Sequence, residues 1–274
     1  MADAELDEAD FERFLALIYR VAGIRIPASK KVMLTNRLRR RLRATGIASF
    51  AEYYERLTAP GSATEMPAFL DAITTNETYF YRDAQQYEWL GGTFLPEFAR
   101  SASPRNKPLR IWSAACATGE EAYSIALKVA ANRPALAGRE VTILGTDLSN
   151  AALASAKAGE YDDRAVHLVP VAERERSFTL DPVQRRWTLK PEIRGLVTWR
   201  YHNLLKPLAS GAFDCIFIKN VLIYFDGESK QSVVRHLLAS LAKGGYLVVG
   251  PTEGIFGMLG PLTRHKTWLY QNPA

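Results

Sequence analysis

Apolar side chains recur at helical spacing through the first 75 residues. The clearest stripe, at i, i+3, i+4 and i+7, consists of Phe11, Phe14, Leu15 and Ile18. A second helix is predicted over 29–46, with the hydroxyl of Ser29 as its candidate N-cap. Shorter helical patterns follow at 50–57 and 65–73. The range 1–75 is therefore predicted to form an all-helical domain.

From Leu109 onward, short apolar runs alternate with helical patterns. The runs have the length and composition of buried parallel strands. They start at Leu109 and continue at 141–146, 197–202, 213–218, 246–250 and 267–270. Helical spacing returns between them, most clearly at 151–158 and 229–242. This alternation predicts an α/β domain over 109–274, with a mainly parallel sheet covered by helices on both faces.

Two segments do not follow this alternation of strands and helices. The range 76–108 is predicted to be a linker, with a helix or connector around Gly91-Gly92. Within the α/β domain, a stretch rich in charged residues and prolines alternates with short apolar runs. We expect its middle, about 163–196, to be a small antiparallel insertion at the edge of the sheet.

The stretch Leu109–Ala126 predicts a strand, a turn of small residues and then a helix. This arrangement lets the backbone approach a nucleotide-like ligand at the carboxyl edge of a sheet. Two carboxylates, Glu120 and Glu121, occupy the start of the helix and would repel a phosphate. A ligand with positive charge and hydroxyl groups, such as S-adenosylmethionine, fits better. The turn alone is equally consistent with Thr118 capping the helix while the glutamates complement its dipole.

An acidic residue, Asp147, ends the second predicted strand. In this class of fold, that position binds the two hydroxyls of an adenosine ribose. Taken alone, Asp147 could equally cap the helix that follows. Its spacing from the first turn favours the ribose role.

Composition and charge limit the partners. The 274 residues are 47% hydrophobic and 23% charged, and no apolar run approaches the roughly 18 residues needed to span a bilayer. The acidic N-terminus lacks the apolar core of a signal peptide. Cys116 and Cys215 are expected to be buried, reduced thiols of a cytosolic protein, and the four histidines show no metal-ligand spacing. The net charge of +6 favours an acidic partner, either nucleic acid or protein.

Five arginines surround the second predicted helix, at Arg37, Arg39, Arg40, Arg41 and Arg43. A solvated helix face is the simpler interpretation. Because all five have the same sign, with no acidic residue between them, a basic interaction face is favoured.

Five segments, in register and in order, resemble the chemotaxis receptor methyltransferases of the CheR type. They are TTNETYFYR, IWSAACATGEEAYSIA, TDLSNAALASAKAGEY, NLL and FDCIFIKNVLIYF. The resemblance runs from about Leu6 to Tyr270. It implies a helical N-terminal domain, a linker and a class I, Rossmann-like methyltransferase domain with an inserted β-subdomain.

The resemblance also implies roles for individual residues. The implied cofactor-binding residues are Asn76, Thr78, Arg82, Glu121, Asp147, Asn203, Leu204, Lys219 and Asn220. Tyr224 and Arg82 are the implied catalytic residues, and Arg37, Arg40 and Arg43 the implied substrate-binding residues. The family commonly has arginine where this chain has Lys219, which puts a bidentate contact there in doubt.

The implied reaction moves a methyl group from S-adenosylmethionine to the γ-carboxylate of receptor glutamates. We expect a cytoplasmic monomer that is recruited to membrane receptor arrays, without metal, nucleic acid or membrane insertion. Two rival functions are a nucleic-acid methyltransferase and a signalling module that binds cofactor or receptor without catalysis. The first lacks support because Lys219-Asn220-Val221-Leu222 stands where amino-methylating enzymes often place Asn/Asp-Pro-Pro-aromatic.

Overall fold

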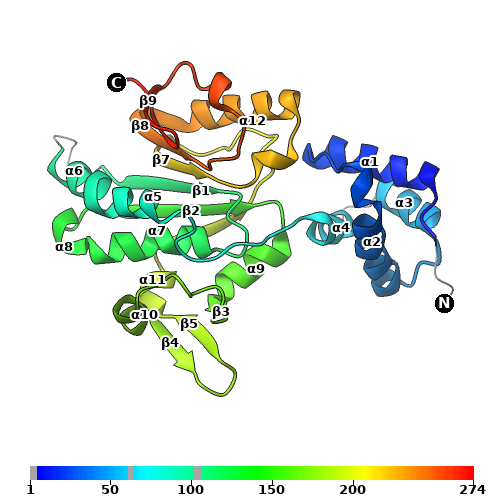
Figure 1. Cartoon of the computed structure of the whole chain (residues 1–274), viewed down its shortest axis with the longest axis horizontal. Helices are drawn as coiled ribbons and strands as arrows, with labels where there is room; N and C mark the ends of the chain where they lie inside the picture. The colour runs from blue at the N-terminus through cyan, green and yellow to red at the C-terminus, as the bar shows by residue number, and fades with distance from the viewer. Residues whose placement is uncertain (1–4, 61–63, 102–106) are drawn as a thin grey trace.

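The computed structural model describes residues 5–60, 64–101 and 107–274. It consists of a group of N-terminal helices beside a larger α/β domain, with a small second sheet extending from the α/β domain (Figure 1). The start of the predicted helical domain, 1–4, and part of the predicted linker, 102–106, lie outside the described residues.

The N-terminal helices are α1 (Glu8–Ala22), α2 (Lys31–Thr45), α3 (Phe50–Thr58) and α4 (Met66–Ile73). They share one apolar core, whose buried members include Phe11, Phe14, Leu34, Leu38, Tyr53 and Phe69. Helix α1 begins where Asp7 accepts the N–H of Asp10, and it ends at Gly23, whose φ of 71° suits glycine.

The predicted cap at Ser29 is wrong. Ser29 lies inside a 3₁₀ turn, η1 (Ala28–Lys30), that leads into α2, and the N-cap position of α2 is Lys30, without a side-chain cap. The turn supplies i→i+3 backbone bonds at the helix start, so the serine hydroxyl is not needed there.

The connection to the sheet is helical over most of its described length. Helix α5 (Ala84–Trp89) continues through a π-helical turn, η3 (Leu90–Phe94), into α6 (Leu95–Arg100). The wider turn falls on Gly91-Gly92, where the sequence left a choice between helix and connector. Gly91 lies close to the side chain of Lys128, so it allows this segment to approach α7 (Glu120–Ala131).

The main sheet has seven strands in the order β6-β2-β1-β7-β8-β10-β9. Its parallel members are β1 (Leu109–Ala114), β2 (Val141–Asp147), β6 (Val197–Tyr201), β7 (Phe213–Ile218) and β8 (Leu241–Val249). Strands β9 (Thr263–Lys266) and β10 (Leu269–Gln271) complete it in antiparallel pairing. The predicted last strand, 267–270, overlaps β10 but begins two residues too early, and β9 was missed because its residues are all exposed and carry no apolar pattern.

Helices connect the strands and pack on the sheet. They are α7, α8 (Arg133–Leu136), α9 (Asn150–Ala158) and α12 (Gly227–Ser240), with a short turn, η4 (Leu222–Tyr224), before α12 and another, η5 (Phe256–Met258), before β9. Strand β8 begins at Leu241, earlier than predicted, because α12 ends at Ser240 and the chain passes into the strand without a loop.

The inserted subdomain is antiparallel, as predicted. It pairs β3 (Glu160–Tyr161), β5 (Arg186–Leu189) and β4 (Phe178–Asp181) in that order. Two short helices, α10 (Val171–Ser177) and α11 (Pro191–Arg194), flank these strands and were not expected from the sequence. Figure 1 shows this subdomain on the side of the sheet where α11 meets α7.

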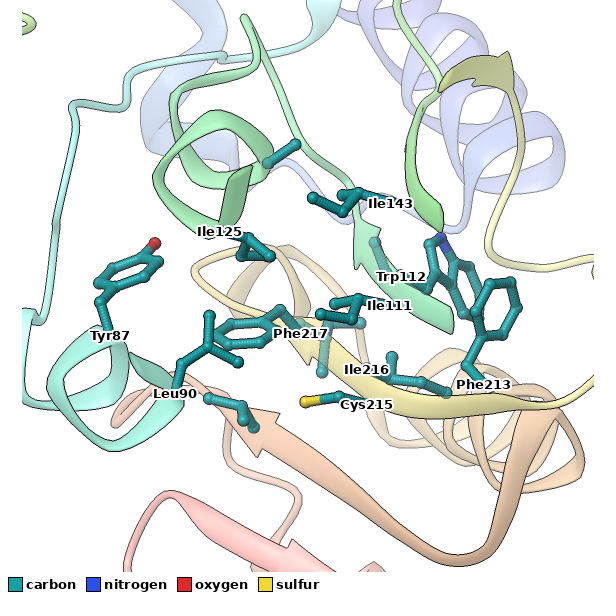
Figure 2. Packing of buried hydrophobic residues seen from close by; sticks show 14 of the residues in the cluster. Tyr87, Leu90, Ile111, Trp112, Ile125, Ile143, Phe213, Cys215, Ile216 and Phe217 are labelled. Carbon is teal, nitrogen blue, oxygen red and sulfur yellow. The ribbon is translucent and has the colours of Figure 1, made fainter. Parts of the chain in front are cut away.

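The core of the α/β domain lies against the central strands. Figure 2 shows Ile111 and Trp112 of β1 beside Ile216 and Phe217 of β7, with Tyr87 and Leu90 approaching from the linker. Every residue of β7 is buried, as expected for a central parallel strand. Both cysteines are buried free thiols, as predicted.

Candidate functional site

A cavity of about 410 Å³ lies where the N-terminal helices meet the carboxyl edge of the sheet. Its lining comes from α2 and the segment before it, from the start of the linker, and from the turns after β1, β2, β6 and β7. Parallel strands of this fold bind ligands at that edge, and here a second domain covers it.

The turn after β1 brings the backbone close to the cavity. Ala115 and Ala117 both have positive φ, and Gly119 follows with a φ of 97°. A Cβ on Gly119 would lie 2.7 Å from the side chain of Ala156 and 2.9 Å from that of Trp199. Only glycine fits at this position, and small side chains keep the rest of the turn open to a ligand.

The two glutamates at the start of α7 have different surroundings. Glu121 lines the cavity, accepts a 2.7 Å hydrogen bond from Ser113, and lies 3.9 Å from the ammonium of Lys219. Glu120 is buried away from the cavity and accepts a 2.7 Å bond from the hydroxyl of Thr118. Thr118 does not cap the helix, since Gly119 occupies the N-cap position. Of the two carboxylates, therefore, only that of Glu121 faces the cavity.

Asp147 ends β2 at the cavity wall, with an exposed fraction of only 6%. One of its carboxylate oxygens accepts the N–H of Ala117 and the other the N–H of Ser149, both at 2.8 Å. Burial raises the pKa of Asp147, and these N–H groups oppose the rise. The N-cap of α9 is Ser149, which excludes the alternative in which Asp147 caps that helix. Asp147 therefore joins the turns after β1 and β2 and keeps lone pairs for a ligand.

Lys219 follows β7 and is the most enclosed cation of the site, with 3% of its side chain exposed. Its ammonium donates a 2.6 Å hydrogen bond to the carbonyl oxygen of Arg82 and lies 3.2 Å from the carboxylate of Asp83. It also lies over the ring of Tyr87, 5.0 Å from the centroid. Together with Glu121, these groups form a largely enclosed network between the sheet and the linker.

Burial raises the pKa of Glu121, and the positive charge of Lys219 opposes that rise. The lysine therefore favours the ionised carboxylate at the cavity wall.

The segment after β6 connects the two domains. The side-chain amide of Asn203 donates a 2.7 Å hydrogen bond to the carbonyl oxygen of Val21 at the end of α1, and its oxygen accepts the N–H of Leu205 at 3.0 Å. Leu204 is buried and also lines the cavity. Both the amide nitrogen and the oxygen of the Asn203 side chain therefore already have a hydrogen-bond partner within the protein.

Asn220 also lines the cavity, in a left-handed conformation with a φ of 58°. Behind it lies Glu253, a fully buried residue of the loop after β8 that accepts backbone N–H groups from Asn220 to Leu222. Glu253 was not predicted from the sequence. A lone glutamate in the loop PTEGIFG carries no pattern that could have revealed it.

Three linker residues with a predicted role, Asn76, Thr78 and Arg82, line the cavity as well. The guanidinium of Arg82 donates to the carbonyl oxygen of Glu77 at 3.3 Å and lies 5.8 Å from the ring of Tyr79. The side chain is therefore held by the linker itself. Phe80 and Tyr81 of the same segment are buried in the core of the α/β domain, so they anchor the linker to the sheet.

The structure separates the arginines of α2. Arg37 lines the cavity, and its guanidinium donates to the carbonyl oxygens of Ile73 and Thr74, the latter at 3.0 Å. Arg41 forms a two-oxygen ion pair with Glu65, with distances of 2.9 and 3.0 Å, so an acidic residue from outside the helix pairs with one of the five arginines. Glu65 lies far away in the sequence, so local spacing could not reveal the pair. Arg40 and Arg43 are exposed and lie outside the cavity lining.

Tyr224 lies at the rim of the cavity, in η4, with an exposed fraction of 37%. This exposure argues against a core-packing role. Its carbonyl oxygen accepts the N–H of Arg25 at 2.8 Å, and Ile24 pairs with Phe225 next to it. The segment that follows α1 is therefore hydrogen-bonded to the backbone at Tyr224 and Phe225.

The lining fits S-adenosylmethionine better than a phosphate-bearing ligand. Glu121 and Asp147 supply negative charge and hydrogen-bond acceptors for cationic groups and hydroxyls. His202 also lines the cavity, and its buried Nε2 has no hydrogen-bond partner among the described residues. Within 5–60, 64–101 and 107–274, no cluster of three or more His, Cys, Asp or Glu side chains could hold a metal ion. No helix of the described chain is long and apolar enough to cross a membrane.

Comparison with known proteins assigns both parts of the chain. Residues 9–74 match the model "CheR methyltransferase, all-alpha domain", and residues 76–267 match "CheR methyltransferase, SAM binding domain". The chain is 36% identical to chemotaxis protein methyltransferase Cher2 of Pseudomonas putida, over 91% of each chain. It is 38% identical to chemotaxis protein methyltransferase 1 of Pseudomonas aeruginosa, over 90% of each chain. The chain is therefore a member of the CheR family of methyltransferases and carries that family's S-adenosylmethionine-binding domain.

Proposed function

We propose that this protein methylates the γ-carboxylate of glutamate residues in the cytoplasmic domain of chemoreceptors and so forms glutamate methyl esters. The observation that carries the proposal is the composition of the cavity rim. Tyr224 of the methyltransferase domain and Arg37 of the helical domain line the same cavity, so a substrate entering it meets both domains. The relatives named as chemotaxis protein methyltransferases support the same reaction class.

In this proposal, S-adenosylmethionine is bound by the residues that line the cavity. Asp147 accepts hydrogen bonds from the ribose hydroxyls, and Glu121 pairs with the ammonium group of the methionine part. Asn76, Thr78 and Arg82 cover the ligand from the linker, and the backbone of Asn203 and Leu204, with Lys219 and Asn220, closes the remaining side. S-adenosylmethionine supplies an electrophilic methyl group on its sulfonium sulfur.

For catalysis, the chain needs no strong base, because a glutamate side chain is already ionised at neutral pH. Its residues act by alignment and by exclusion of water. Tyr224 orients the incoming carboxylate with its hydroxyl, while Arg82 stabilises the closed linker around the reacting groups. Both are proposed catalytic residues.

The protein substrate is bound, in this proposal, by the exposed side of α2. Arg40 and Arg43 are free of the cavity and face solvent, where they can contact the acidic surface of a receptor helix. The protein then acts as a cytoplasmic monomer recruited to receptor arrays, where the methylated glutamates lie.

The test is transfer of label from methyl-labelled S-adenosylmethionine. A receptor cytoplasmic domain should gain base-labile label, and the same domain with its methylated glutamates replaced by alanine should not. Structured RNA serves as the second acceptor, because a nucleic-acid methyltransferase would label it instead. Label on neither acceptor, together with intact cofactor binding, would favour a signalling module without catalysis.

A further inference from the structure

The loop after β7 carries three residues of the site on a short piece of backbone. Lys219, Asn220 and Tyr224 all line the cavity, and Asn220 has a left-handed conformation. Asparagine tolerates such a conformation better than most residues, but the loop still needs partners that hold it in place. Those partners lie outside the cavity.

Glu253 provides them from the neighbouring loop, after β8. One of its carboxylate oxygens accepts the N–H of Asn220. The other accepts the N–H of Leu222 at 2.7 Å and, more weakly, that of Val221 at 3.3 Å. Three consecutive N–H groups thus point at one side chain.

The carboxylate is completely buried, with an exposed fraction of 0%. Removing a charge from water is costly unless hydrogen bonds compensate it. Burial raises the pKa of Glu253, while the three N–H groups and the nearby Lys230 favour its charged form. A side chain that only filled space here would be apolar, so the carboxylate is explained by the N–H groups it accepts.

A glycine makes room for this contact. A Cβ on Gly250 would lie 2.4 Å from a carboxylate oxygen of Glu253 and 3.2 Å from the backbone nitrogen of Asn220. The N–H of Gly250 meanwhile donates to the carbonyl oxygen of Ile218 at 3.0 Å, which keeps the ends of β7 and β8 together. Glu253 therefore crosses from one strand end to the next at a position where no larger residue fits.

We propose that Glu253 is a positioning residue of the methyl-transfer site, which holds the backbone of Asn220–Leu222 and thereby places Lys219, Asn220 and Tyr224 at the cavity. It does not line the cavity itself, so it acts through this loop. The part of the proposal that concerns turnover rests on the proposed function, whereas the part that concerns the loop and cofactor affinity does not.

The experiment compares the full-length protein with Glu253→Gln, which keeps size but replaces one accepting oxygen by an amide NH₂. Amide hydrogen exchange at 220–222 should become at least tenfold faster. S-adenosylhomocysteine affinity, measured by calorimetry, should fall severalfold. Turnover on receptor should fall at least tenfold, with a smaller change in the KM for receptor. The matched control is Glu228→Gln, an exposed glutamate on α12 with the same change of charge.

Gly250→Ala tests the same contact without altering the carboxylate, in case Glu253→Gln does not fold. It should reproduce the faster exchange at 220–222 and the weaker affinity. Gly257→Ala is its control, since a Cβ there meets nothing within 4 Å.

Two results would overturn the proposal. One is wild-type exchange at 220–222 in both Glu253→Gln and Gly250→Ala. The other is faster exchange with unchanged S-adenosylhomocysteine affinity and unchanged turnover, which would leave Glu253 a purely structural role. If the wild-type protein fails to methylate receptor, the proposed function is wrong, but exchange and affinity still decide the role of Glu253.

Discussion

The ammonium of Lys219 lies 2.6 Å from the carbonyl oxygen of Arg82 and joins the loop after β7 to the linker. The same ammonium lies between two carboxylates, those of Asp83 and Glu121. A compact point charge can serve these partners at once, without the planar geometry of a guanidinium. Lysine at this position thus directs its positive charge toward protein groups.

This network predicts the effect of Lys219→Met. The variant leaves the partly exposed carboxylates of Asp83 and Glu121 without their cation, so the free energy of unfolding should fall by about 1–3 kcal/mol. Urea unfolding measures this change. Lys219→Arg, which retains the charge, is the control and should lose much less stability. Equal losses in both variants would show that side-chain shape, and not charge, governs the site.

Asp147 should contribute to cofactor binding beyond its structural hydrogen bonds. Asp147→Ala leaves the ribose hydroxyls unpaired, and S-adenosylhomocysteine binding should weaken by about 1–3 kcal/mol in calorimetry. Ser149→Ala serves as the control, because it removes only the cap of α9, at a cost of about 1 kcal/mol of stability. Unchanged affinity in a folded Asp147→Ala protein would remove this residue from the ligand site.

Glu121 should lower the free energy of unfolding at neutral pH while it strengthens cofactor binding. Because burial raises its pKa in the folded chain, the folded state holds the proton more tightly than the unfolded state. Its contribution to the free energy of unfolding is therefore present below the ordinary carboxyl pKa and is lost as pH rises through the folded pKa. The difference in the free energy of unfolding between Glu121→Gln and wild type should therefore shift in favour of the variant when the pH is raised from acidic to neutral.

Denaturant unfolding at both pH values measures this difference. The same variant should bind S-adenosylhomocysteine more weakly, by about 1.5–3 kcal/mol, because the charged acceptor is lost. A stability difference independent of pH would contradict the argument.

Arg37 and Arg43 should behave differently, although the sequence treats them alike. Arg37 donates to the carbonyl oxygens of Ile73 and Thr74, at the end of α4, and to the hydroxyl of Thr75, directly before Asn76. Arg37→Ala should therefore weaken both stability and S-adenosylhomocysteine affinity. Arg43→Ala should weaken only receptor methylation, by about 0.2–1 kcal/mol.

Salt provides the second readout for Arg43, because exposed charges are screened over about 10 Å at 0.1 M. Raising salt should slow wild-type receptor methylation and reduce its difference from Arg43→Ala. Wild-type rates for Arg43→Ala across this salt range would exclude a substrate contact.

Tyr224 should affect turnover alone. Its side chain is partly exposed at the rim, so Tyr224→Phe should change the free energy of unfolding by less than about 0.5 kcal/mol. Turnover on receptor should fall, because the hydroxyl that orients the carboxylate is gone, and S-adenosylhomocysteine affinity should stay near wild type. Loss of affinity together with stability would instead indicate a packing role.

The local pattern was enough to predict the longer helices, the parallel strands and their order. Apolar spacing identified α1, because burial of one helix face gives a periodic pattern. Continuous apolar runs identified the central strands, because these are buried on both faces. The β9 strand was missed since exposed edge residues leave no such record. The antiparallel subdomain was predicted because its sequence interrupts the alternation of strands and helices. Its helices α10 and α11 are too short to show a helical period.

By itself, the sequence determined the fold class, the family and the list of polar residues that follow the strands, because these depend on local spacing and on motifs in order. Only the tertiary structure decided which partner each of those residues has. Arg37 donates to the carbonyl oxygen of Ile73 at the end of α4, Lys219 donates to that of Arg82, and Glu253 accepts the N–H of Asn220. These contacts span sequence separations of 36, 137 and 33 residues. Such contacts follow from how whole elements pack, and no local pattern in the chain encodes the direction in which a long polar side chain finds its partner.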